Sequence, residues 1–88
     1  MRALPSLLFL SLATSPIALA QSTLLENVKN NPEEARSMCR QFKALNSQGI
    51  SANSPQAINK VAKQLNLTIP DAEIVSTYVI GLNCPDVR

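Results

Sequence analysis

The sequence predicts an all-α protein, a small bundle of three to four short helices closed by one disulfide bond. Three segments carry a proline one or two residues after a capping residue, at Pro32, Pro55 and Pro70, which is typical of the start of a helix. Apolar residues recur at helical spacing in these segments. The 88-residue chain also holds only two cysteines, Cys39 and Cys84.

The first twenty residues have the three parts of a secretory signal peptide. Arg2 supplies the positive charge, and the run from Leu4 to Ala13 is almost free of polar side chains. The segment ends on Ala18 and Ala20, which fit the small-residue requirement of the peptidase. We therefore expect a signal peptide over residues 1–20, with cleavage between Ala20 and Gln21.

An uncleaved membrane anchor is the alternative interpretation of this segment. An anchor needs roughly 20 apolar residues, and the run from Leu4 to Ala13 is about half that length. Pro16 is expected to end the apolar helix and to leave the cleavage site extended. The product is then secreted or periplasmic, with no membrane span after cleavage.

Residues 21–88 leave 68 residues, enough for a single small helical domain with a core over about 31–85. A domain of this size buries only about 60% of its surface on folding, so a covalent link is expected. Both cysteines lie in the exported part, where a disulfide is stable, and one intramolecular pairing is possible, Cys39 with Cys84. An intermolecular disulfide or a redox-active thiol is the alternative.

The clearest helix signal begins at Asn31, which suits the N-cap. Pro32 then takes the first helical position, and Glu34 completes a capping box. Gly49 can adopt the left-handed conformation that ends a helix. The apolar face of this helix is expected to hold Ala35, Met38, Cys39, Phe42 and Leu45.

Two further helices are expected on either side of this one. Thr23 and Glu26 form a capping-box pattern, which predicts a short first helix within residues 21–30. Ser54 before Pro55 starts the other, which stops near residue 66. Its apolar stripe contains Ala57, Ile58, Val61, Ala62 and Leu65.

The last segment, residues 71–83, is open to two interpretations. Its β-branched residues favour a strand, but no other segment offers a partner strand for its backbone. A helix started by Thr68 and Pro70 and ended by Gly81 and Pro85 is therefore predicted. Its core-facing residues would be Val75, Tyr78, Val79 and Leu82.

Composition excludes several kinds of chemistry. The chain has no histidine, which removes the usual proton shuttle and most nucleophile and zinc sites. The paired acids Glu33/Glu34 and Asp71/Glu73 fall in first helical turns, where capping explains them. No catalytic residue, metal ligand or cofactor site is therefore expected, and we predict that the protein is not an enzyme.

The low net charge argues against nucleic-acid binding. Without Arg2, seven basic residues stand against six acidic ones, a net charge of +1, which gives no strong attraction to an anionic surface. Arg36, Arg40 and Lys43 recur at helical spacing. They form either an ordinary solvated face or a small basic contact strip for an acidic partner.

The pattern of Met38-Cys39, Gly49 and Cys84-Pro85 resembles the small secreted helical proteins, of mycobacterial type, grouped as domain of unknown function 732. The resemblance covers about residues 24–86. Asn83 departs from it, because an aromatic residue often precedes the last cysteine there. Membership would imply an all-helical fold and the Cys39–Cys84 bond, and it would carry over no activity.

Three functions then remain. The first is a non-enzymatic module that binds an unknown protein or envelope component, with the basic strip as its possible contact. The second is a periplasmic chaperone of the acid-stress type, although the chain has few groups that titrate as pH falls. The third is a carrier of a small apolar ligand, although 68 residues can hardly enclose a pocket of about 300 Å³.

Overall fold

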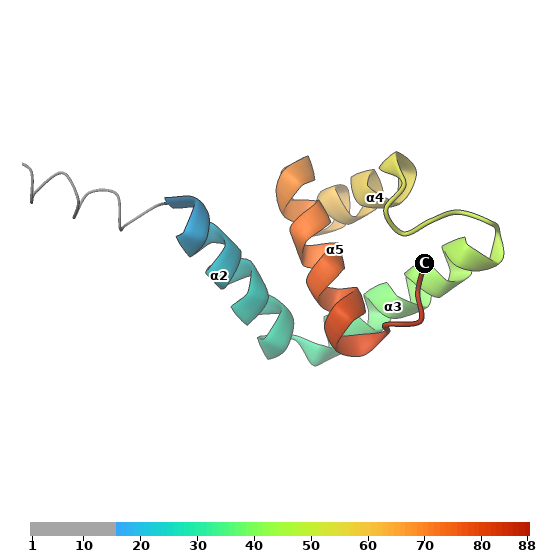
Figure 1. Ribbon diagram of the computed structural model, residues 1–88, viewed down its shortest axis with the longest axis horizontal. Coiled ribbons are helices and arrows are strands. Elements are labelled where there is room, and N and C mark those ends of the chain that lie inside the picture. The colour runs from blue at the N-terminus through green and yellow to red at the C-terminus, as the bar shows by residue number, and fades with distance from the viewer. Residues whose placement is uncertain (1–15) are drawn as a thin grey trace, which may run out of the picture.

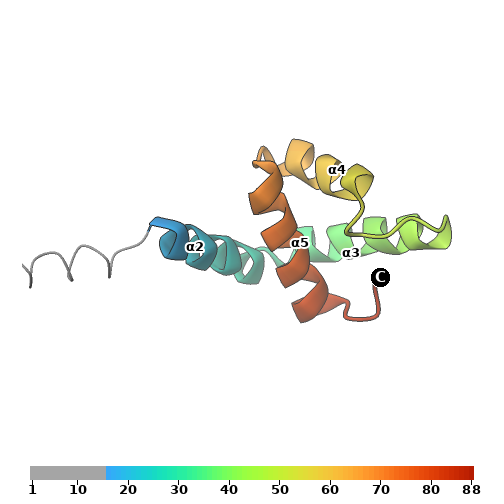
Figure 2. The same cartoon turned by 45° about the horizontal axis from the view of Figure 1, so that its top comes forward.

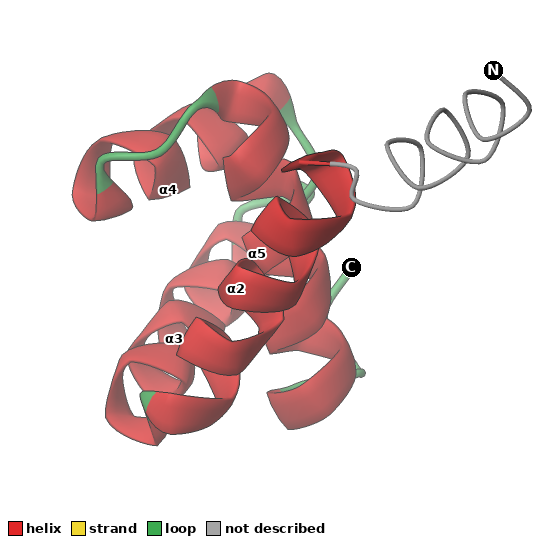
Figure 3. Cartoon of the chain, turned by 90° about the vertical axis from the view of Figure 1, so that its left-hand side faces the viewer, coloured by secondary structure: helices red, strands yellow, loops and turns green. Residues whose placement is uncertain are grey.

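The computed structural model describes residues 16–88, and side-chain environments from Thr23 onward. Within this part the chain forms four α-helices and no strand (Figures 1 and 3). They are α2 (Pro16–Asn30), α3 (Pro32–Ser47), α4 (Pro55–Leu65) and α5 (Ile69–Asn83). The predicted all-α fold is confirmed, and the segment that could have been a strand is a helix.

Helix α5 is the centre of the arrangement, since it contacts α2, α3 and α4. Figures 1 and 2 show the C-terminal part of α5 crossing the junction between α2 and α3, while α4 packs near the N-terminal end of α5. Its buried face consists of Ala72, Val75, Ser76 and Val79. The other helices bury their stripes against this face, which explains why no single helix has to be stable alone.

The core follows the predicted stripes of α3 and α4 closely. Phe42 is 2% exposed and is among the largest fully enclosed side chains of the described residues. Leu45 and Leu65 are only partly buried, and Leu65 packs against the edge of the core. The buried members of the two stripes are Ala35, Met38, Cys39 and Phe42 of α3 and Ala57, Ile58, Val61 and Ala62 of α4.

Two of the predicted N-caps are confirmed. The Ser54 hydroxyl accepts a hydrogen bond from the Ala57 N–H at 3.2 Å, and the Thr68 hydroxyl accepts one from the Asp71 N–H at 3.3 Å. Each bond satisfies a backbone donor that the first helical turn leaves unpaired.

The predicted capping box at Asn31 and Glu34 is wrong. Asn31 makes no side-chain cap; its Nδ2 donates to the backbone oxygen of Asn27 at 2.7 Å. The reason is the one-residue gap between α2 and α3, which leaves the last carbonyls of α2 within reach and in need of donors. Pro32 does take the first position of α3, as predicted.

The first helix begins earlier than predicted. It starts at Pro16, so Thr23 and Glu26 lie inside α2 and are not a capping box at its start. Pro16 is the first residue of α2, a position that suits proline, and the residues that follow include the strong helix formers alanine and leucine. The predicted extended cleavage site is therefore helical in this chain. Residues 1–15 lie outside the described part, and the signal peptide with its cleavage between Ala20 and Gln21 stays a prediction.

Of the three residues predicted to end helices, two do so. Gly49 has φ +79°, and Asn66 ends α4 with φ 55°, both in the left-handed region. Gly81 does not end α5, which continues to Asn83. The stop comes at Cys84, because the residue before a proline is pushed out of the helical conformation.

The predicted disulfide is present. Cys39 and Cys84 are joined with Cα atoms 6.0 Å apart, so the middle of α3 is tied to the residue that follows α5. Both cysteines are buried, and no free cysteine is found among the described residues. The single intramolecular pairing is thus the one that the structure holds.

The last residues fold back onto the end of α3, a feature that the sequence did not reveal. The Asn46 side chain donates to the Arg88 backbone oxygen at 2.8 Å and accepts from the Arg88 N–H at 2.7 Å. The Arg88 oxygen also accepts from the Ala52 N–H at 2.8 Å. The segment after the disulfide therefore closes over the loop between α3 and α4.

Candidate functional site

The predicted basic strip lies on the outer face of α3. Arg36, Arg40 and Lys43 are all exposed. Arg36 donates from Nε and Nη2 to one oxygen of Glu33, at 3.1 and 2.8 Å, while Lys43 lies 3.7 Å from an Asp86 carboxylate oxygen. Arg40 has no ion pair within residues 16–88. The strip is thus partly compensated by neighbouring acids and keeps one unpaired guanidinium.

These cations form one wall of a groove of about 440 Å³. The other wall is the end of α5, where Leu82 is 54% exposed. The disulfide joins the two walls. We call this hollow the basic groove; its lining residues are Arg36, Cys39, Arg40, Lys43, Leu82, Asn83 and Cys84.

Leu82 was predicted to face the core, and the structure overturns that prediction. Ser76, which is completely buried, takes the place on the inner face of α5 instead. Helix α5 is apolar around most of its circumference, so its hydrophobic pattern alone does not specify which side packs inward. The consequence for the site is an apolar side chain left beside three cations.

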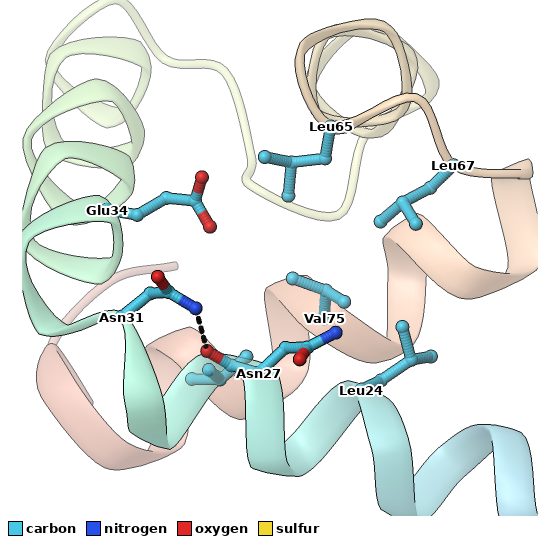
Figure 4. A pocket seen from close by; sticks show the side chains of 8 residues that line it. Leu24, Asn27, Asn31, Glu34, Leu65, Leu67 and Val75 are labelled. Atoms are coloured by element: carbon cyan, nitrogen blue, oxygen red, sulfur yellow. Dashed lines mark hydrogen bonds between the residues drawn. The ribbon is translucent and has the colours of Figure 1, made fainter.

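A second hollow lies where α2, the start of α3, the end of α4 and α5 meet (Figure 4). We call it the inner cavity; its volume is about 250 Å³. Its apolar lining is Leu24, Val28, Leu65, Leu67 and Val75, and its polar lining is Asn27, Asn31 and Glu34. Figure 4 shows the Glu34 carboxylate on the α3 side of this space, facing the Leu65 and Val75 side chains.

Within each of the two acidic pairs, one residue takes part in a local interaction of its own helix. Glu33 holds Arg36, and the backbone of Asp71 is capped by Thr68. Among the residues that the structure describes, no three His, Cys, Asp or Glu side chains are grouped as ligands of a metal ion would be. No helix of residues 16–88 has both the length and the apolar character needed to cross a bilayer.

Comparison with protein families gives a match over residues 25–84 to the model described as Domain of unknown function (DUF8664). The chain belongs to the DUF8664 family. No curated protein and no solved structure matches it. The DUF8664 match contains every residue of the basic groove and all but Leu24 of the inner cavity.

The resemblance to domain of unknown function 732 was therefore wrong. It rested on a cysteine in an early helix, a glycine after that helix, and a final Cys-Pro. The structure shows why such a pattern is weak evidence: each of these residues performs a general task, namely a disulfide, a left-handed helix end and a helix stop. Any helical domain with one such disulfide can share them.

Proposed function

We propose that this DUF8664 domain is a non-enzymatic binding module of the cell envelope or the extracellular medium, and that its basic groove binds an acidic segment of a partner protein. The observation that carries the proposal is the combination of three exposed cations on one wall and an exposed leucine on the other. A segment that carries carboxylates next to an apolar side chain complements both walls.

The existing ion pairs of the groove do not prevent such binding. Arg36–Glu33 and Lys43–Asp86 join side chains that are all more than half exposed, and pairs of this kind contribute about 0–1 kcal/mol. A partner carboxylate can therefore replace Glu33 or Asp86 at small cost. Arg40 needs no such exchange, and its planar guanidinium suits bidentate contact with a carboxylate.

Leu82 supplies the apolar part of the contact. It is 54% exposed and is not one of the buried residues of α5, so its side chain is accessible to a partner. The disulfide fixes the end of α5 against α3, so the two walls are held before any partner arrives. Such preorganisation lowers the entropic cost of binding.

The proposed location follows from two features. Residues 1–20 have the pattern of a secretory signal peptide, and the fold contains a disulfide, which is stable in oxidising compartments. We propose that the protein acts in the periplasm or outside the cell.

The test uses a fluorescent peptide of alternating glutamate and leucine, with binding followed by anisotropy at low and physiological salt. The variant R36Q/R40Q/K43Q removes the cations of the groove. The control K29Q/K60Q/K63Q removes three exposed cations of α2 and α4, so its net charge changes equally. We expect the groove variant to bind at least about tenfold more weakly and the control to lose only a few-fold. Leu82→Ser should also weaken binding while the melting temperature stays unchanged. Equal losses in the two triple variants would show that the peptide responds only to net charge, and the basic groove would be rejected as the site.

A further inference from the structure

The inner cavity divides into an apolar part and a polar rim, which come from different helices. Leu24 and Val75 are nearly buried at its sides, while Leu65 and Leu67 are only half-buried and border the opening. Asn27, Asn31 and Glu34 follow one another along the junction of α2 and α3, so the rim is a single polar edge (Figure 4). A space with this division suits an amphipathic molecule that has one polar end.

The rim consists of one carboxylate and two carboxamides, so its only charge is negative. Glu34 carries the only formal charge among the lining residues. The neighbouring cation, Arg36, is bonded to Glu33, and Glu34 has no ion pair in the described part of the chain. The Nδ2 group of Asn31 donates one hydrogen bond to the Asn27 backbone oxygen, and the side-chain oxygens of Asn27 and Asn31 can act as acceptors beside the carboxylate.

A carboxylate and amide oxygens together match a primary ammonium group, which has three N–H donors and a positive charge. A carboxylate or phosphate ligand is disfavoured, because Glu34 would repel it and no lysine or arginine lines the cavity. The volume of about 250 Å³ lies just below the range of about 300–1,000 Å³ typical of sites for drug-sized ligands. The occupant must therefore be small.

We propose that the inner cavity binds a small alkylammonium compound, with the ammonium group at Glu34 and the alkyl chain between Leu24, Leu65 and Val75. The site is independent of the basic groove, because no residue lines both hollows. The two sites also have opposite charge preferences. One DUF8664 domain would thus bind an acidic partner on one face and a small organic cation on another.

The experiment is an NMR titration of the purified ¹⁵N-labelled protein with hexylammonium, and with hexanoate and hexanol as ligands of the same chain length. Glu34→Gln removes the charge and keeps the side-chain shape. Glu33→Gln is the matched control, since Glu33 is the adjacent residue, is also exposed, and does not line the cavity.

We expect saturable shifts at the amides of Leu24, Leu65 and Val75 with hexylammonium and none with hexanoate. Glu34→Gln should weaken hexylammonium binding roughly fivefold, as for a solvent-accessible ion pair, and leave hexanol binding unchanged. Glu33→Gln should bind as the wild type does. Absence of saturable shifts, equal binding of hexanoate, or equal effects of the two glutamate variants would each overturn the proposal.

Discussion

Helices α2 and α5 are both fifteen residues long, yet the protein holds them in opposite ways. Helix α5 touches the three other described helices and is tied to α3 through Cys84. From Thr23 onward, α2 buries only Leu24 and Val28, and it borders the inner cavity along its inner face. We call α3 and α5, which the disulfide joins, the frame. Helix α2 packs against this frame without a covalent link to it. The basic groove belongs to the frame, whereas the inner cavity lies at the edge that α2 covers.

The largest expected effect comes from opening the frame. Removal of the disulfide with C39S/C84S should lower the free energy of unfolding by about 4 kcal/mol, because a closed loop with a sequence separation of 45 residues restricts the unfolded chain. Urea denaturation with and without a reductant measures this loss. A midpoint that does not move on reduction would contradict the role of the frame.

The next largest effect is expected from shortening buried side chains, which should cost more stability in the frame than in α2. Met38→Ala in the frame should cost about 3 kcal/mol, and Leu24→Ala in α2 about 2 kcal/mol, near the lower end of the range for buried large-to-small changes. The smaller value is expected because Leu24 already borders an empty space, so its removal loses fewer packing contacts. Urea denaturation of both variants gives the comparison, and a larger loss for Leu24→Ala would show that α2 belongs to the frame.

Two serines, Ser76 in the buried face of α5 and Ser54 at the N-cap of α4, should respond in opposite ways to substitution by alanine. Ser76 is completely buried and its hydroxyl has no hydrogen-bond partner among the described residues, so Ser76→Ala should be neutral or stabilising by up to about 1 kcal/mol. Ser54→Ala should destabilise by about 1 kcal/mol, because the bond to the Ala57 N–H is lost. Thermal melts of the two variants should therefore move in different directions. A clear destabilisation by Ser76→Ala would mean that its hydroxyl has a partner after all.

The smallest effect is expected at the surface of the groove. Lys43→Gln removes the exposed pair with Asp86 and should change the free energy of unfolding by less than about 0.5 kcal/mol. Chemical denaturation checks this value. A loss above about 1 kcal/mol would show that the pair stabilises the frame, and binding losses in the groove variants would then need correction for stability.

The sequence predicted features that depend on neighbouring residues. The caps at Ser54 and Thr68 involve donors three residues away, so the local pattern was sufficient. Asn31 failed as a cap because the nearby end of α2 competes for its side chain. Similarly, the start of α2 was placed too late because the capping-box pattern at Thr23 lies in the middle of a longer helix.

The candidate sites depended more on tertiary structure. The cations of the basic groove were visible as a helical repeat, but Leu82 joins them only because α5 packs through Ser76 and because the disulfide brings its end to α3. The inner cavity could not be predicted, since its lining comes from all four described helices and from two of the connections between them. No short motif encodes a space that forms where several elements fail to meet completely.

The distinction between the frame and α2 is tested most directly by native-state hydrogen exchange of two matched amides, those of Val28 in α2 and Val79 in α5. Both side chains are buried inside helices of equal length. We expect Val79 to exchange only through global unfolding, and Val28 to exchange through a local opening that costs at least about 2 kcal/mol less. Equal protection of the two amides would show that α2 and α5 form one cooperative unit, and the distinction between the frame and α2 would be wrong.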